Sequence, residues 1–538
     1  MKNRLTKLFA LATSAVICFA CVGCGGNNTD DKDGAWDGKK IVIYRESNDA
    51  LGADEESVKT AVQQKYYEDT GIKLDLQFTL LTQNNFKTEV NNAIEEGIQL
   101  DAISGRTGLD GGGVETFALS GDDNKGYYKD LSDLLDEYGT NLKKNISADA
   151  WARLTTSTNE IIGIPGEENP SKYGILVRKD LMQKVGYTDD ATDGSGKKEV
   201  KTIDDFIDMC KKMTDRIELT SKKSSYVISG QLWDLERVLY GAYTPSGYYS
   251  GYALDKNGNL IPGYLSEGYK NAVQATYEWA SYKNNNMTLI KTDNASDTVL
   301  EGDFIAGRAG VCIQWPEISH LIKVARRCKQ ENPNAEFCIL GPLTDNDGNT
   351  YGFKCEPLCA EACVIMKDSE NAVDVIKFMD WMYSDVNNLM LCQYGIEGKH
   401  WVNVDDSTYK YPEGKEEDYI INRQVFGLYG IVKNNVMLNK TLDSYTQEER
   451  GWIDKVRGFK RYEDPMNTLL LPSVPNEQAF RDEVTARGSL FAYIQRMLWG
   501  TLDPAGTEKS FESVLAEYNG AAGEYLKWLA NEYNFIKG

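Results

Sequence analysis

Histidine and positive charge are both scarce in this chain. Only two histidines, His320 and His400, occur among 538 residues, so a three-histidine zinc site is impossible and imidazole acid–base chemistry has few places to occur. Lys and Arg number 59 against 81 Asp and Glu, which gives a formal net charge of −22. Nucleic-acid binding depends on cations that neutralise phosphates, so this balance argues against a nucleic-acid partner. It argues equally against adhesion to an anionic membrane through a basic surface.

Long apolar runs are missing from the body of the chain. Beyond residue 20, none approaches the ~18 uninterrupted apolar residues of a membrane-spanning helix. The N-terminus differs, because residues 1–7 carry three cations and no acid, and residues 8–20 are almost wholly apolar. This order is typical of a secretory signal, and its apolar part is short for a membrane span. We therefore expect an exported protein.

Residues 21–28, Cys-Val-Gly-Cys-Gly-Gly-Asn-Asn, follow this signal. A small residue directly before a cysteine, with a Gly- and Asn-rich stretch after it, resembles the lipobox of bacterial lipoproteins. The resemblance implies that residues 1–23 are removed and that Cys24 carries a lipid. Cys21 stands where leucine is usual, so cleavage before Cys21 is an alternative, and a plain signal peptide without a lipid is another.

Eight of the eleven cysteines follow Cys24. An even number in an exported protein is compatible with disulfides. However, Cys355, Cys359 and Cys363 would lie on one face of a strand, where neighbours are badly placed to pair with each other. We expect mostly buried free thiols. The Cys-x3-Cys-x3-Cys spacing is a weak alternative as a metal site, because no histidine accompanies it.

Two Asp/Asn/Gly-rich stretches, 255–259 and 345–349, look like calcium loops at first sight. Neither has acids at both the first and twelfth positions of an EF-hand loop, so both are predicted to be turns. No metal or other cofactor is expected.

The first hundred residues of the body alternate between apolar runs and helical stretches. They predict three strands and two intervening helices, at 41–44, 72–78 and 100–103 and at 55–70 and 86–94. Gly71 ends the first helix, as glycine does past a helix end. Strands that alternate with helices indicate a parallel sheet covered on both faces, in which ligands collect at the carboxyl ends of strands. The polar loops 45–48 and 104–108 occupy that position.

Later segments extend this pattern. Residues 161–165 and 173–181 are apolar strands around a Gly- and Pro-containing connection, which is a candidate crossing between two lobes. A helix is expected at 202–213, where Thr202 is the N-cap.

Five pieces of sequence appear in a fixed order: residues 67–74, 92–103, 173–181, 304–311 with Trp315-Pro316 behind it, and 394–401. Together they resemble the extracellular solute-binding proteins of ABC sugar importers, the maltose-binding-protein-like family, in its long lipoprotein subgroup. Leu100 departs from the proline usual in the second piece, and residues 410–538 match more loosely.

The resemblance implies an α/β fold, with two periplasmic-binding-protein-like lobes joined by hinge crossovers. It implies a non-catalytic protein outside the cytoplasm that works with ABC permease subunits in the membrane and binds a sugar. We expect a monomer anchored to the outer face of the cell membrane. The expected divisions are a signal at 1–23, a tether at 24–38, an N-lobe at 39–165 and 356–400, and a C-lobe at 166–355 and 401–538.

Aromatic side chains support a sugar ligand independently. The chain has 31 tyrosines and 10 tryptophans. Sugars present apolar C–H faces that pack on aromatic rings, and hydroxyls that need donors and acceptors. Most of these aromatic residues must nevertheless be ordinary core or surface residues.

Candidate ligand contacts lie at strand ends, helix starts and glycine-flanked loops. They are Arg45, Glu46, Asn48, Arg106, Trp233, Asp234, Tyr248, Tyr249, Trp315, Glu317 and Glu356. We expect Trp315 to stack on a sugar ring, and either Trp233 or the Tyr248–Tyr249 loop to cover another. The charged and amide groups at the first and third strand ends would bind hydroxyls from the opposite lobe. The alternatives are core positions for the tryptophans, loop packing for the tyrosines and exposed surface charge for Arg45, Glu46 and Arg106.

Two other functions remain open from the sequence. A glycoside hydrolase or lyase needs two carboxylates across the bond it cleaves, and adjacent acids are common by chance in a chain with 81 of them. No Gly-x-Ser-x-Gly elbow or phosphate-binding loop accompanies them. A cell-surface polysaccharide-capture protein without a transporter is the other alternative.

Overall fold

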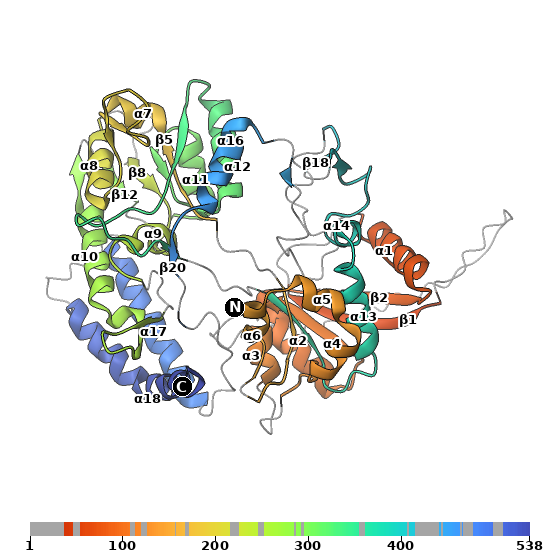
Figure 1. The fold of residues 1–538 in the computed structure, drawn as a ribbon. Helices are drawn as coiled ribbons and strands as arrows, with labels where there is room; N and C mark the ends of the chain where they lie inside the picture. The colour runs from red at the N-terminus through yellow and green to blue at the C-terminus, as the bar shows by residue number, and fades with distance from the viewer. Residues whose placement is uncertain are drawn as a thin grey trace, which may run out of the picture.

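Two β-sheets, each covered by helices, organise the chain into two lobes (Figure 1). The computed structural model describes residues 37–46, 54–107, 113–119, 126–156, 158–166, 172–215, 225–245, 252–284, 287–291, 295–354, 361–405, 408–414, 441–442, 445–462, 465, 477–498 and 509–537. The signal segment, Cys24 and almost all of the tether lie outside these residues.

The sheet of the first lobe has the strand order β2-β1-β3-β16-β4. Its strands are β1 (Lys39–Glu46), β2 (Leu74–Leu81), β3 (Ala102–Arg106), β4 (Ile164–Pro165) and β16 (Glu361–Ile365). β1 runs parallel to β2 and β3, whereas β16 runs antiparallel to β3 and β4. Ile41, Val42 and Ile43 are all buried, because β1 is an interior strand whose two faces are both covered.

Helices cover both faces of this first sheet. One hydrophobic cluster joins it to α1 (Glu55–Thr70), α4 (Ser132–Tyr138), α5 (Thr140–Asn145), α13 (Ala372–Met382) and α14 (Val386–Tyr394). A second cluster joins it to α2 (Gln83–Glu95) and α3 (Val114–Leu119), and α6 (Ala148–Arg153) contacts β4. Gly71 has a φ of 73° and donates its N–H to the Tyr67 carbonyl, so the predicted helix end is confirmed.

The sheet of the second lobe has the order β11-β12-β8-β13-β5-β14. Its strands are β5 (Ile175–Arg178), β8 (Ser225–Ser229), β11 (Lys283–Asn284), β12 (Met287–Ile290), β13 (Val311–Cys312) and β14 (Phe337–Leu340). β12, β8 and β13 are parallel, and β5 is antiparallel to both β13 and β14. Because β4 belongs to the first sheet and β5 to the second, the chain passes from one sheet to the other between them, as predicted.

The helices of the second lobe pack on this sheet and on each other. They are α7 (Lys179–Lys184), α8 (Ile203–Met213), α9 (Leu232–Val238), α10 (Glu267–Ser281), α11 (Asp297–Ile305), α12 (Ile318–Glu331) and α16 (Gln447–Arg457), with 3₁₀ turns at Tyr240–Ala242 and Gly263–Leu265. The predicted N-cap of α8 is confirmed: the Thr202 side chain accepts from the Asp205 N–H, and the Asp205 side chain accepts in return from the Thr202 N–H. Two long helices, α17 (Glu477–Leu498) and α18 (Phe511–Lys537), pair with each other, and α17 packs against α10.

Several small two- and three-stranded sheets lie outside the two main sheets. They are β6 (Tyr187–Thr188) with β7 (Lys198–Glu199), β9 (Tyr252–Leu254) with β10 (Leu260–Pro262), β15 (Phe353–Lys354) with β20 (Arg461–Tyr462), and β17 (Val402–Asn403) with β18 (Thr408–Lys410) and β19 (Thr441–Leu442). In each of the segments 255–259 and 345–349, the backbone N–H of the last residue donates to the side chain of the first residue, an aspartate. Both segments are therefore turns, as predicted.

One segment joins the two lobes through side-chain packing. Trp401, Tyr409 and Tyr411 form a small cluster with Met390 of α14, in the first lobe. The predicted division places residues after 400 in the C-lobe, whereas these contacts tie Trp401, Tyr409 and Tyr411 to an N-lobe helix. Tyr445 packs both on this cluster and on the cluster around α12 and α16. The lobe boundaries themselves stay a prediction.

The six cysteines for which the structure gives a state are buried and unpaired: Cys210, Cys312, Cys328, Cys338, Cys363 and Cys392. Cys363 lies in β16, whereas Cys355 and Cys359 lie outside the described residues. Among the described residues, no helix is long and apolar enough to cross a membrane, and no group of His, Cys, Asp or Glu has the arrangement of a metal site.

Candidate ligand-binding site

The carboxyl edge of the first sheet carries buried charge. Arg45 and Glu46 end β1 with exposed fractions of 3% and 6%, so the alternative of exposed surface charge is wrong for both. Arg106, at the end of β3, donates from Nε to Glu46 Oε1 at 2.8 Å and from its backbone N–H to Oε2 at 3.3 Å. Gly105 permits this approach, because a Cβ there would lie 2.7 Å from the Glu46 Cβ. The strand ends thus hold Arg106 in a fixed orientation.

A second ion pair lies behind the same edge, on α3 and α6. Arg153 Nη2 donates to Glu115 Oε1 at 2.9 Å, and the two side chains are 2% and 1% exposed. Arg153 Nε and Nη1 are buried and have no hydrogen-bond partner among the described residues. A guanidinium in this position depends on its carboxylate for charge compensation.

Trp315 follows β13 at the carboxyl edge of the second sheet. Its side chain is 53% exposed, so the core alternative is wrong for this residue. Its φ is +48°, and Asn159 is the one other non-glycine residue with positive φ in the described part of the chain. Left-handed backbone costs a residue with a side chain about 1–3 kcal/mol, and the residue before a proline is disfavoured in compact conformations. Pro316 follows directly, so the surrounding structure must hold Trp315 in place.

Asp234 lies next to this backbone in the first turn of α9. Its side chain is 0% exposed. Oδ1 accepts from the Trp315 N–H at 3.3 Å, and Oδ2 accepts from the Gln231 N–H at 3.0 Å. Burial raises the pKa of Asp234 to about 7, although both N–H groups and nearby Arg237 oppose this shift. Asp234, predicted as a ligand contact, is therefore positioned to hold backbone rather than to meet solvent.

The chain after Trp315 is fastened to the start of β5. Pro316 accepts from the Gly174 N–H at 2.9 Å, and Glu317 Oε2 accepts from the Lys172 N–H at 3.2 Å. A bridge pairs Tyr173 with Glu317. Glu317, another predicted contact, is half-buried and serves this connection.

Three polar residues at this edge, Gln231, Asp297 and Gln314, were not predicted from the sequence. Gln231 caps α9 and donates from Nε2 to Asp297, the first residue of α11. Gln314 precedes Trp315, and its side-chain amide is buried without a hydrogen-bond partner among the described residues. Their signal is positional, because each begins a helix or follows a strand at the carboxyl edge.

The other predicted contacts divide into two groups. Trp233 is half-buried on α9, next to Asp234. Asn48, Tyr248, Tyr249 and Glu356 lie outside the described residues, as does Cys24.

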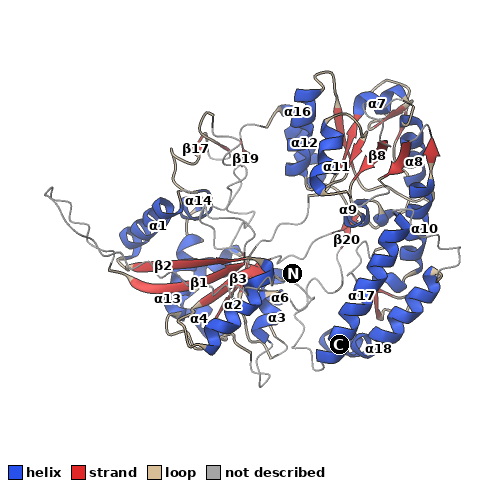
Figure 2. Ribbon diagram, turned by 180° about the vertical axis from the view of Figure 1, so that it is seen from behind, coloured by secondary structure: helices blue, strands red, loops and turns tan. Residues whose placement is uncertain are grey.

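The two carboxyl edges lie on the inner sides of the two lobes. α3 and α6 lie on the side of the first lobe nearest the second, and α9 and β20 lie on the side of the second lobe nearest the first (Figures 1 and 2). The carboxyl edges of both sheets thus lie on the sides where the two lobes are nearest each other.

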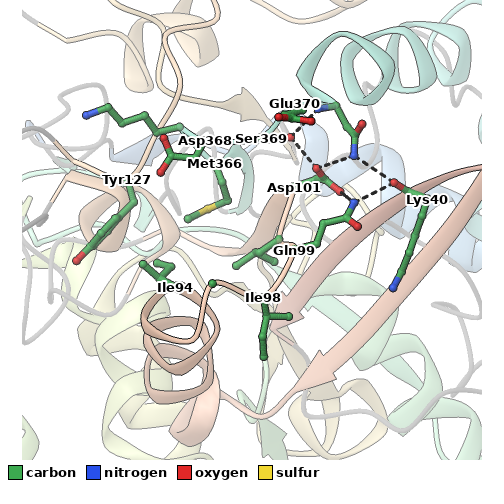
Figure 3. Close-up of a pocket in the computed structure, with 14 residues that line it drawn as sticks. Lys40, Ile94, Ile98, Gln99, Asp101, Tyr127, Met366, Asp368, Ser369 and Glu370 are labelled. Atoms are coloured by element: carbon green, nitrogen blue, oxygen red, sulfur yellow. Dashed lines mark hydrogen bonds between the residues drawn. The ribbon is translucent and has the colours of Figure 1, made fainter.

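A cavity of about 590 Å³ lies at the opposite, amino-terminal edge of the first sheet (Figure 3). Asp101 organises it by accepting from Val42 N–H, Gln99 Nε2, Ser369 Oγ and Asn371 Nδ2, at 2.8, 2.8, 2.7 and 3.0 Å. Both carboxylate oxygens are therefore occupied within the protein. This network ties β1, β3 and the residues after β16 together.

The sequence profile of the bacterial extracellular solute-binding proteins matches residues 50–388. The chain belongs to this family. A curated relative, the polygalacturonan/rhamnogalacturonan-binding protein YtcQ of Bacillus subtilis, is 22% identical over 302 residues. The match spans 55% of this chain and 55% of that protein, so it reaches only about half the length of the relative.

Solved structures of solute-binding proteins share the fold. An extracellular solute-binding protein of Bifidobacterium longum subsp. infantis aligns with a TM-score of 0.66 at 15% identity, covering 93% of this chain and 99% of that one. The alginate-binding protein AlgQ2 gives 0.65 at 14%, covering 94% and 100%. The N-glycan transport protein NgtS of Streptococcus pneumoniae gives 0.61 at 15%, covering 93% and 99%. The predicted two-lobed α/β fold and the predicted family are both confirmed.

Proposed function

We propose that this solute-binding protein captures a sugar or oligosaccharide between its two lobes and delivers it to ABC permease subunits in the membrane. The observation that carries the proposal is Trp315, a half-exposed indole held at the carboxyl edge of the second sheet. An indole face matches the apolar C–H face of a sugar ring. Sheets of this kind bind ligands at that edge.

The first lobe supplies the polar complement in this proposal. Arg106 and Glu46 are oriented by their mutual ion pair, and hydroxyl groups need such fixed donors and acceptors. The similar proteins support the ligand class, because they are named for binding or transporting polygalacturonan, rhamnogalacturonan, N-glycans or alginate, or hold kestose. We further propose that ligand favours a closed arrangement of the lobes.

The proposal places the protein outside the cytoplasm as a non-catalytic monomer without a cofactor, anchored by a lipid on Cys24. The family description supports the extracellular location. Mass spectrometry of membrane-extracted protein is expected to give an N-terminal peptide that begins at diacylglyceryl-Cys24. A water-soluble product with an unmodified N-terminus would contradict the anchor.

A thermal-shift screen tests the ligand class, because a ligand that binds only the native state raises the melting temperature. The probes are oligogalacturonides, alginate oligosaccharides, Man5GlcNAc and kestose. Titration calorimetry of the wild type and Trp315→Ala then tests the site. Tyr67→Ala is the matched control, since Tyr67 is 38% exposed in the last turn of α1, away from the carboxyl edge. Binding that Trp315→Ala leaves unchanged would contradict the proposed site, and small-angle scattering without compaction at saturation would contradict closure.

A further inference from the structure

Trp315 combines an unfavourable backbone conformation with an exposed ring. Three features coincide there: a φ of +48°, a following proline and a side chain that is 53% exposed. Backbone outliers of this kind persist only where surrounding contacts over-determine them. The contacts around Trp315 therefore indicate how its ring is kept at the surface.

Two sets of contacts act on this backbone. On the C-terminal side, Pro316 and Glu317 pair with residues 172–174. On the N-terminal side, Trp315 N–H donates to Asp234 Oδ1 at 3.3 Å. The other carboxylate oxygen closes the capping box of α9 by accepting from the Gln231 N–H. One buried carboxylate thus links the start of α9 to the peptide of Trp315, 81 positions later in the chain.

We propose that Asp234 is a positioning residue, whose ionised carboxylate holds the Trp315 backbone in its left-handed conformation and so presents the indole for ligand binding. This inference rests on the proposed function and deepens it. An ionised carboxylate accepts hydrogen bonds strongly at both oxygens, whereas a protonated one carries an O–H donor on one oxygen and accepts more weakly there. Ligand affinity is then linked to the protonation of a residue that does not touch the ligand.

The charges around Asp234 support a change in its protonation within the physiological pH range. Arg237 on α9 approaches Oδ1 at 3.6 Å, and Asp297 on α11 opposes it as a like charge. Glu317 follows Trp315 by two residues and is engaged by the Lys172 N–H. Burial dominates these influences and raises the pKa of Asp234 to about 7. Ligand affinity is therefore expected to rise as pH increases from 5 to 8.

Fluorescence tests the positioning step without any ligand. The emission of Trp315 is isolated as the difference between wild type and Trp315→Phe, and its acrylamide quenching is measured from pH 5 to 9. We expect one transition at about pH 7, and we expect Asp234→Asn to abolish it. The matched control is Asp454→Asn, because Asp454 is a 70% exposed acid of the same lobe. A flat wild-type profile, or a transition that survives in Asp234→Asn, would overturn the proposal. A flat wild-type profile overturns the proposal even if Asp234→Asn does not fold.

A double-mutant cycle tests the consequence for binding, with pentagalacturonate or Man5GlcNAc as the probe. Asp234→Asn is expected to weaken binding about tenfold in the wild-type background and less than about twofold in Trp315→Ala, since coupled residues are not additive. Equal losses in both backgrounds would overturn the proposal, because Asp234 would then act without Trp315. If Trp315→Ala leaves binding of both probes unchanged, the proposed binding site fails, while the fluorescence transition still decides the positioning role.

Discussion

The carboxyl edges of the two sheets differ in the kind of side chain that they present. In the first lobe, Glu46 at the end of β1 orients Arg106 at the end of β3, and Glu115 on α3 pairs with the buried Arg153 on α6. In the second lobe, an aromatic ring is exposed, and its left-handed backbone is contacted by the buried Asp234 and flanked by the pairing of Pro316 and Glu317 with residues 172–174. The first edge thus presents oriented polar groups, and the second presents an exposed aromatic face.

The largest expected effect is on stability, at the buried ion pair of the first lobe. Glu115→Ala leaves the Arg153 guanidinium buried without its counter-charge, and removing one partner of such a pair costs about 3–5 kcal/mol. Chemical denaturation would measure the loss. Glu56→Ala is the control, because Glu56 is 80% exposed in its ion pair with Lys59, and its melting temperature should match the wild type. Equal stability of the two variants would contradict this account of the first edge.

The next effect is on affinity, at the second edge. Trp315→Ala should weaken glycan binding by at least about thirtyfold, because truncating an aromatic anchor costs roughly 2 kcal/mol or more. Stability should be retained, because the ring is already half in solvent. Calorimetric titration and a melting curve of the same variant measure both quantities. A loss of stability without a specific binding defect would return Trp315 to a structural role.

A smaller affinity effect is expected at the first edge. Arg106→Ala should weaken binding about tenfold, since a hydrogen bond to a charged group contributes about 1.5 kcal/mol. Arg106→Ala should also leave Glu46 buried without this partner. Arg106→Lys is therefore needed as a second variant, because it restores the positive charge without the planar guanidinium group. The contrast between the edges would be lost if Arg106→Lys bound as tightly as the wild type while Arg106→Ala did not, because charge alone would then suffice.

The smallest expected effect is a pH dependence of stability, and it comes from His400, outside the two carboxyl edges. Burial lowers the pKa of His400, although Asp54 opposes the shift. His400 Nδ1 accepts from the Ile396 N–H at 2.9 Å, which a protonated ring cannot do. The unfolded chain binds this proton more readily, so stability should fall as pH drops below about 6.5. Melting curves of wild type and His400→Gln across pH 5–8 should converge in acid, and parallel curves would contradict the assignment.

Local signals predicted much of the fold. Gly71 and Thr202 were identified as helix boundaries because capping depends on residues within one turn. The strands of the first sheet were found from apolar runs, although β2 and β3 begin two residues later than expected and extend further. Trp315 was recognised as a strand-end residue from the apolar run before it.

The partners of these residues could not be predicted in the same way. Glu46 meets Arg106 across 60 positions, Asp234 meets Trp315 across 81, and Glu115 meets Arg153 across 38. No local rule selects one acid among 81 for such a contact.

By itself, the sequence determined the elements, their order and the strand ends at which functional groups lie, because propensity, capping and periodicity act over a few residues. The tertiary structure alone decided that Arg45, Glu46 and Asp234 are buried while Trp315 is exposed with φ at +48°. Burial and backbone strain depend on what packs around a residue, and those neighbours come from distant parts of the chain.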